Sequence, residues 1–318
     1  MIFVDGLSCD HVGSWVGGGC LMNRGALAFG IGLCVLPATA ALASDITQCG
    51  QTVSTGDVGV LMVDLVCPSM SAVRVSNGAT LELNGHSISA PGASAVAAEF
   101  VPVPTGVPRH KFSVVGPGTI YGSDTGIEGV GGIRVSMVTI HDTGTGIKTT
   151  SNSRRGTLKL TDVTITQSSD PTNGVGVVAN KVTASGLTVT GMPFDGIMVQ
   201  KINGADVVAS GNGPGIPSLG VGFGIGAKTI HLQNLTANDN DGSGVFAEKI
   251  ALRDSTVTGN RGAITDPNTH KFTSDIDVFT DSRPKLVNTV CGKSYNPGLD
   301  ASWHVCQNDS PSGAFLDE

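Results

Sequence analysis

The sequence predicts an all-β solenoid, in which short repeats stack on one another and share a single core. One pattern returns between Ile133 and Ile264: apolar, any, small or apolar, two turn-like residues, then apolar, any, apolar. Successive copies begin 25, 24, 20, 28 and 20 residues apart, and most are followed by a glycine and an apolar residue. A period near 20 residues in short alternating pieces is typical of stacked solenoids. The copies begin at Ile133, Leu158, Val182, Ile202, Ile230 and Ile250.

Two earlier pieces, which begin at Leu81 and Phe112, bring the expected number of coils to about eight or more. The composition agrees with this fold, because 45 of the 318 residues are glycine and only 4% are aromatic. Glycine suits tight turns, and small aliphatic side chains fill a narrow core. The net charge of −7 argues against a nucleic-acid partner, which favours a basic surface. An anionic polysaccharide is not excluded, since a basic stripe can exist on an acidic protein.

The N-terminal residues 1–43 read as a targeting segment. After Met22, the expected start, come one arginine, an apolar run and the small-residue end Ala41-Leu42-Ala43. This order is typical of a secretory signal cleaved after Ala43, and the apolar run is too short to span a bilayer as a helix. We therefore expect a secreted or periplasmic protein without a membrane span.

Four cysteines remain after residue 43, and they lie in two groups at opposite ends of the repeats. An even number of cysteines in an exported chain indicates disulfides. We expect the pairs Cys49–Cys67 and Cys291–Cys306. A metal site is the alternative, but no Cys-x-x-Cys or paired His accompanies these residues. No motif predicts a cofactor, and none supports Ca²⁺.

The chain divides into five parts by these signals. After the targeting segment, we expect an N-terminal cap over residues 44–78, the solenoid over 79–280, a C-terminal cap over 281–306 and a disordered tail over 307–318. The C-terminal cap is needed because an open last coil would expose unpaired backbone groups.

The opening repeats carry strings of residues with a wider resemblance. A Cys-Gly-Gln string and an Asp-Leu-x-Cys string precede Leu83-Asn84-Gly85-His86-x-Ile88. With the later piece Phe112–Ile120, they resemble exported right-handed parallel β-helix proteins of the pectin-lyase-like superfamily. The resemblance covers residues 47–306. It implies a single-stranded right-handed parallel β-helix with disulfide-stapled ends.

The enzymes of this superfamily act on acidic polysaccharides, and they include pectate lyases, polygalacturonases, alginate lyases and mannuronan epimerases. The polygalacturonase and pectate-lyase strings are absent here. Tyr121-Gly122-Ser123-Asp124 is similar to the first half of an epimerase motif whose second half is missing. The resemblance therefore transfers no catalytic residue.

Two long insertions point to a site. Ile165 to Val177 takes 12 residues and Ala209 to Ile225 takes 16, whereas the other copies take 7 or 8. Both insertions leave from the same corner and flank a short coil that contains Phe194 and Asp195. We expect them to wall a notch with these two residues on its floor, because function concentrates on long loops of rigid scaffolds. The alternative is two tolerated surface insertions.

A row of lysines precedes the first core position of several copies, including Lys181, Lys201 and Lys249. Stacked ~5 Å apart, such charges suit an anionic glycan. The alternative is that lysines at strand ends only discourage aggregation.

The carboxylates and one histidine also have both a functional and a structural interpretation. Asp162 and Asp206 are expected ~10 Å apart, near the carboxylate spacing of inverting glycosidases, although a tight turn also selects Asp. Asn212, Asn240 and Asn260 align as a structural hydrogen-bonded stack. We expect a buried His86 at a core position.

The sequence thus predicts an exported protein, expected as a monomer, that binds a polysaccharide or cell-envelope glycan, with an acidic glycan favoured, and it leaves cleavage of that glycan open. A lyase or glycoside hydrolase of unrecorded motif and a non-catalytic structural or adhesive protein are the alternatives. The candidate catalytic residues are Asp195, Lys201, Asp170, Lys181 and His231, and the candidate substrate-binding residues are Phe194, Asp206 and Lys249.

Overall fold

The computed structural model describes residues 43–99, 111–149, 156–167, 174–213, 222–265 and 272–309. The chain divides into two compact units, Met1–Ala40 and Ala41–Glu318, and every described residue belongs to the second. The predicted targeting segment lies outside the described residues except for Ala43. Among the described residues, no helix is long and apolar enough to cross a membrane.

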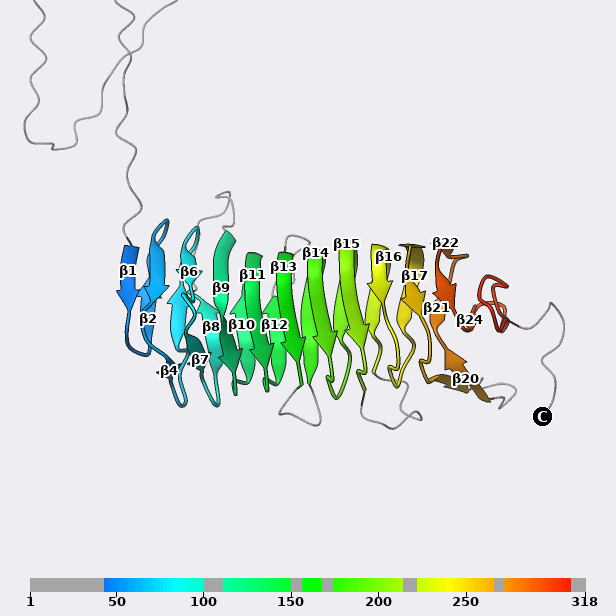
Figure 1. The fold of residues 1–318 in the computed structure, drawn as a ribbon, viewed down its shortest axis with the longest axis horizontal. Coiled ribbons are helices and arrows are strands. Elements are labelled where there is room, and N and C mark those ends of the chain that lie inside the picture. The colour runs from blue at the N-terminus through cyan, green and yellow to red at the C-terminus, as the bar shows by residue number, and fades with distance from the viewer. Residues whose placement is uncertain are drawn as a thin grey trace, which may run out of the picture. The chain divides into compact units, whose positions relative to one another are not determined.

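The regular elements of the described residues are all β-strands (Figure 1). The N-terminal strands are β1 (Ala43–Ile46), β2 (Gln51–Val53), β3 (Val58–Leu61), β4 (Leu65–Val66), β5 (Val73–Val75), β6 (Thr80–Glu82), β7 (Ser87–Ser89) and β8 (Ser94–Ala98). The central strands are β9 (Lys111–Tyr121), β10 (Thr125–Gly129), β11 (Gly132–His141), β12 (Thr145–Thr149), β13 (Thr157–Thr166), β14 (Val175–Thr190), β15 (Ile197–Ser210), β16 (Ile225–Thr236) and β17 (Val245–Arg253). The last strands are β18 (Thr256–Val257), β19 (Gly262–Thr265), β20 (Phe272–Ile276), β21 (Val278–Thr280), β22 (Lys285–Val287), β23 (Val290–Cys291) and β24 (Ser294–Tyr295).

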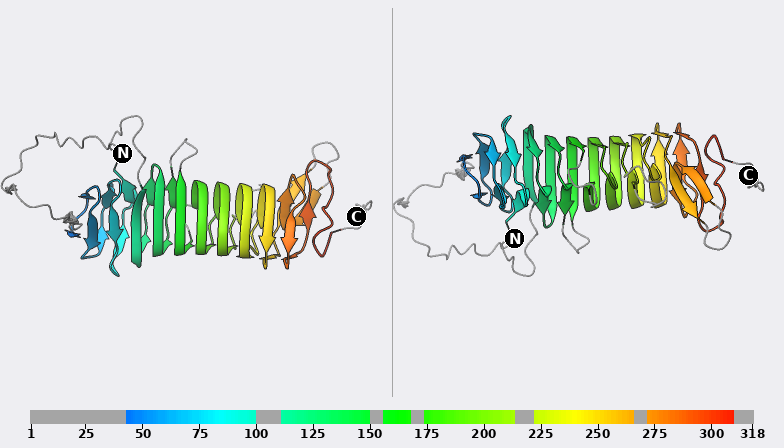
Figure 2. Two further views of the ribbon diagram at one scale, coloured as in Figure 1. Left: turned by 90° about the horizontal axis from the view of Figure 1, so that it is seen from above. Right: turned by 90° about the horizontal axis from the view of Figure 1, so that it is seen from below.

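All of these strands except β19 and β20 belong to one large parallel sheet, which curves until it is nearly closed. β19 and β20 form a separate antiparallel pair. Strands that follow one another by about one sequence repeat lie side by side, in chain order from blue to red (Figure 2). The all-β prediction is confirmed.

The register of the sheet matches the repeat in the sequence. Ile133 pairs with Leu158, and the same row continues through the first core residue of every later copy. Phe112 precedes Ile133 in this row, as expected. The exception is Leu81, which pairs with Val114, so its expected alignment with Phe112 is wrong.

The core is built from rows of aliphatic side chains. Along each strand, inward residues alternate with outward ones, so a row such as Val182, Ile202 and Ile230 is fully buried. Removing a Val or Ile side chain from water stabilises the fold by about 1.5–3 kcal/mol. The unequal repeat lengths leave this register intact because the extra residues lie between strands.

The glycine before each apolar residue has a packing role. A Cβ at Gly146 would lie 2.5 Å from the carbonyl oxygen of Gly176, and a Cβ at Gly176 would lie 2.5 Å from that of Gly196. Real Cβ atoms do not approach backbone this closely, so each repeat needs glycine where its backbone meets the next repeat.

The strands bend at three kinds of corner. At the first corner, two consecutive non-core residues such as Gln200 and Lys201 interrupt the alternation. At the second and third corners, residues with positive φ turn the chain, as at Asp206 (56°) and Asp239 (56°). Asp162 and Asp206, for which a turn was the alternative interpretation, have positive φ, as do the residues aligned with them: Met137, Gly186, Asn234 and Asp254. Their structural interpretation is therefore confirmed.

Disulfides hold both ends. Cys49 bonds to Cys67 and Cys291 bonds to Cys306, with Cα separations of 5.6 and 5.0 Å, so both expected pairs are confirmed. Two disulfides are consistent with an extracellular or otherwise oxidising compartment. Beside the second disulfide, the Asp309 carboxylate accepts bonds from the backbone N–H of both Val305 and Cys306. Residues 310–318 of the predicted tail lie outside the described residues.

Candidate functional site

One side of the sheet carries an extended basic surface. It consists of the outward residues between the first and second corners, from β9 to β22, and we call it the basic face. Outward residues of neighbouring parallel strands share a face and repeat every ~4.8 Å across the sheet. Eight of the chain's 19 Lys and Arg residues are exposed there: Lys111, Arg134, Lys159, Lys181, Lys201, Lys249, Arg253 and Lys285.

The uncharged neighbours of these cations are polar or small. Between them lie outward residues such as Thr183, Asn203 and Gln233. Among the described residues of this face, none is Asp or Glu; acidic residues border it at Glu82 of β6, which pairs with β9, and at second-corner turns such as Asp206. The ion pairs of the described residues use none of the eight cations. A chain of net charge −7 therefore gathers cations on one face.

The lysine row expected from the sequence is present at the edge of this face. Lys181 pairs with Lys201, and Thr229 separates Lys201 from Lys249. His231 is exposed and is the next outward residue after Thr229 along β16, in the neighbouring row of the basic face. Four of the eight predicted site residues thus lie on the basic face.

Asp195 lies elsewhere, in the turn before β15. Its side chain is only 3% exposed, and Oδ1 accepts bonds from the backbone N–H of Phe223 (2.9 Å) and Gly222 (3.1 Å). Burial raises the pKa of the Asp195 carboxyl, while the two backbone bonds oppose this rise. The carboxylate anchors the described end of the second insertion.

The half-buried Phe194 is also held by backbone, because its N–H donates to the carbonyl of Gly174 at 3.0 Å. The turn therefore contacts the described ends of both insertions. The predicted notch stays a prediction, because residues 168–173, with Asp170, and 214–221 lie outside the described residues.

The predicted residues do not converge on one centre. Lys201 follows Asp195 by six residues, which is ~20 Å of extended strand, with the first corner in between. Asp206 is exposed at the second corner, where it accepts a bond from Asn234 Nδ2 at 2.9 Å. Asp195 and Lys201 are therefore not placed to act on the same bond.

The predicted asparagine stack is confirmed. Nδ2 of Asn212 donates to Oδ1 of Asn240 at 3.0 Å, and Nδ2 of Asn240 donates to Oδ1 of Asn260 at 2.8 Å. All three residues are buried. Buried polar groups are tolerated when they are fully hydrogen-bonded, so this row connects repeats at the third corner.

The expected burial of His86 is wrong. Its side chain is 33% exposed, and Nδ1 lies 3.4 Å from Oδ1 of Asp64. Leu83 fills the core beside Gly118, where an added Cβ would meet it. A left-handed turn at Gly85 (φ 81°) then directs the next residue outward.

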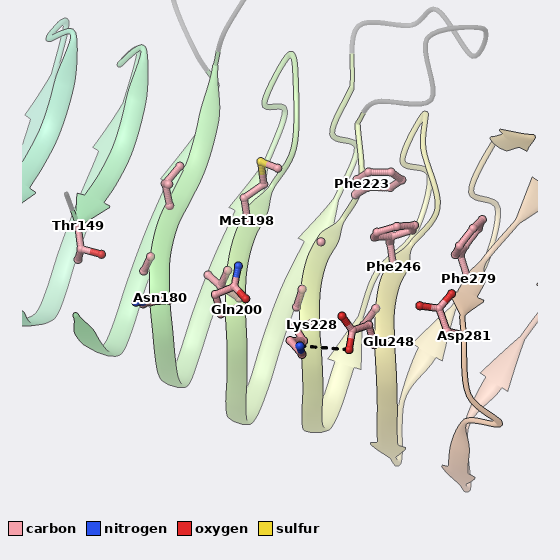
Figure 3. Close-up of a pocket in the computed structure, with 16 residues that line it drawn as sticks. Thr149, Asn180, Met198, Gln200, Phe223, Lys228, Phe246, Glu248, Phe279 and Asp281 are labelled. Atoms are coloured by element: carbon pink, nitrogen blue, oxygen red, sulfur yellow. Dashed lines mark ion pairs between the residues drawn. The ribbon is translucent and has the colours of Figure 1, made fainter. Parts of the chain in front are cut away.

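A second feature, a groove with an apolar floor, was not found from the sequence (Figure 3). It has a volume of about 700 Å³ and lies on the face that joins the basic face at the first corner. We call it the aromatic groove. Its lining includes one row of apolar side chains, Val178, Met198, Phe223, Phe246 and Phe279, and one polar row, Asn180, Gln200, Lys228, Glu248 and Asp281.

The aromatic rings of this groove form a continuous stack. The ring of Phe246 lies 4.9 Å from that of Phe223 and 4.7 Å from that of Phe279. Gly226 occupies the register position next to Phe246, and an added Cβ there would lie 3.6 Å from Phe223. Phe223 therefore contributes its ring beside a position that lacks a side chain.

No protein-family model, curated protein or solved structure matches the chain. The described residues contain no group of three or more His, Cys, Asp or Glu side chains placed to hold a metal ion.

Proposed function

We propose that the protein is an exported right-handed parallel β-helix that binds an acidic polysaccharide along its basic face. The fold proposal is supported by the continuous parallel register of the copies and by the two disulfides at the ends. The single observation that carries the function is the gathering of exposed cations on one face without a carboxylate among the described outward residues.

A linear polyanion suits this face for physical reasons. Its charges repeat along one direction, as do the rows of cations, and each contact adds a modest gain at an exposed site. Hydroxyl and amide side chains between the cations, such as Thr183 and Asn203, supply hydrogen bonds to sugar hydroxyls. We propose binding without cleavage, because the Asp195 carboxylate is bonded to backbone and lies apart from the lysine row.

The experiment measures binding of the purified compact unit, Ala41–Glu318, to a panel of acidic and neutral polysaccharides. We expect binding to an acidic member and none to neutral members. The double variant Lys181→Glu/Lys201→Glu is expected to bind at least ~10-fold more weakly, since reversing charges in a polyanion site replaces attraction by repulsion. The matched control is Arg74→Glu, an exposed cation of β5 outside the basic face.

The same samples are assayed for unsaturated uronate and for new reducing ends. Neither product is expected. Either product would contradict binding without cleavage and would identify a lyase or a hydrolase, respectively. Equal binding by the double variant and the control would contradict the proposal that the basic face is the binding site.

A further inference from the structure

We propose that the aromatic groove is the interface with a second copy of this chain, related by a two-fold axis that passes between β16 and β17. This inference does not rest on glycan binding, because it concerns a different face. It starts from exposed apolar side chains: Met198 and Phe246 remain 45% and 36% exposed. Contiguous apolar surface of this kind marks an interaction site on a soluble protein.

The charged residues of the groove can pair with the same residues of a second copy. Lys228 of β16 and Glu248 of β17 lie opposite each other in the register, with Nζ and Oε2 3.5 Å apart (Figure 3). A two-fold axis between these strands places Lys228 of one copy against Glu248 of the other, and the reverse. Such a contact is isologous, so the same surface patch serves both copies.

The sizes of the apolar side chains follow the same symmetry. The row begins with the small Val178 and the flexible Met198 and ends with the rings of Phe246 and Phe279. The axis sets Met198 of one copy against Phe279 of the other, a favourable contact of sulfur with an aromatic ring. Nearer the axis, the ring of Phe223 beside Gly226 faces Phe246 of the other copy, so aromatic rings also meet across the interface.

The polar row continues this match. Gln200 lies one strand before Lys228, and Asp281 lies one strand after Glu248. The axis brings Gln200 of one copy to Asp281 of the other, where the amide donates to the carboxylate. Charge, size and hydrogen bonding thus indicate one antiparallel arrangement of two rods.

The aromatic groove is small for the interface of a permanent dimer. The row from Val178 to Phe279 crosses five adjacent strands, ~19 Å, whereas a stable interface buries about 800 Å² on each partner. We therefore expect a dimer that dissociates on dilution. The proposal replaces the monomer expected from the sequence.

The test is sedimentation velocity of Ala41–Glu318 over a wide range of concentrations, for the wild type, Lys228→Glu, Glu248→Lys and an equimolar mixture of the two variants. The wild type is expected to dimerise. Each variant alone sets like charges opposite each other across the axis and is expected to dimerise at least ~10-fold more weakly. The mixture restores opposite charges in both contacts, so it is expected to form the heterodimer.

Two further samples keep the result interpretable. Lys159→Glu changes an exposed charge on the basic face, away from the groove, and is expected to dimerise as the wild type does. Phe246→Ser removes an exposed ring and is expected to be monomeric while keeping the wild-type circular dichroism spectrum. A wild type that stays monomeric, a mixture that stays monomeric, or a Phe246→Ser variant that dimerises as the wild type does would each overturn the proposal.

Discussion

Asp277 ends the row of buried asparagines at the C-terminal side of the sheet. Its Oδ1 accepts bonds from both the backbone N–H (3.1 Å) and Nδ2 (2.7 Å) of Asn260, the last asparagine of the row. Its Oδ2 accepts a bond from the backbone N–H of Lys293 at 2.9 Å. An acceptor is needed at this point, because the preceding amides all donate in the same direction. The carboxylate thereby ties the repeats to the C-terminal cap.

Removing the middle of this row is expected to be costly. Asn240→Ala leaves the backbone N–H and Nδ2 of Asn212 and the carbonyl of Ala209 without their partners. Unsatisfied buried groups cost about 1–3 kcal/mol each, so we expect a loss of at least ~2 kcal/mol in urea unfolding. Asn203→Ala, on the basic face, is the matched control and is expected to change stability little. Similar losses for both variants would contradict the role of the row.

The pH dependence of stability provides a second test. Burial raises the folded-state pKa of Asp195 above its ordinary value, so the folded protein holds this proton more tightly than the unfolded chain does. The resulting contribution to stability is fully present below the unfolded pKa and is lost as pH rises through the folded pKa. Asp195→Asn keeps an oxygen for the two backbone bonds and cannot ionise.

We therefore expect urea unfolding across the acidic range to show a smaller fall in stability with rising pH for Asp195→Asn than for the wild type. Asp206→Asn, at an exposed turn, is the matched control and is expected to follow the wild-type profile. Identical profiles for Asp195→Asn and wild type would show that burial of Asp195 does not contribute to this dependence.

The glycine row makes a position-specific prediction. Gly176→Ala places a Cβ 2.5 Å from the carbonyl oxygen of Gly196, and such overpacking costs about 1–3 kcal/mol. Gly226→Ala meets nothing closer than 3.6 Å and is expected to be nearly neutral. Thermal unfolding of the two variants, measured side by side, checks this difference. Equal midpoints would argue against the close backbone approach.

The C-terminal disulfide is expected to add stability both as a covalent link and through the buried Cys291, which belongs to the core. Cys291 and Cys306 are 15 residues apart, and closing such a loop stabilises by about 3 kcal/mol in the chain-entropy model. The double variant Cys291→Ser/Cys306→Ser is expected to lose at least this amount in denaturant unfolding, because it also places a hydroxyl at the buried position 291. Added reductant should lower the stability of the wild type towards that of the variant, in which this disulfide is already absent.

The sequence predicted the stacked register well because its signal is repetitive. Alternation of aliphatic residues gives the inward rows, and glycine or Asp at fixed positions gives the corners. The asparagine row was found for the same reason, since Asn212, Asn240 and Asn260 recur at one corner. Asp277 was not found, because it follows the point where the repeat fades.

The aromatic groove was not predicted for a different reason. Phe246 and Phe279 occupy one row, but Phe223 enters it from the end of an insertion, beside Gly226. The spacing of residues in the sequence does not reveal that the ring of Phe223 occupies the space left by Gly226. The position of Asp195 was predicted at the correct corner, but its burial depends on backbone N–H groups of a distant segment. Such contacts leave no pattern in the sequence.

The central claim is that the basic face binds an acidic polysaccharide through its charges. The most direct measurement is the affinity of Ala41–Glu318 for a polyuronate as a function of salt concentration, compared with Lys181→Glu/Lys201→Glu and Arg74→Glu. We predict that wild-type affinity falls steeply with salt, since exposed charges are screened over ~10 Å at 0.1 M ionic strength. The double variant should bind weakly with a shallow salt dependence, whereas Arg74→Glu should behave as the wild type. Salt-independent binding that all three proteins share would contradict the claim.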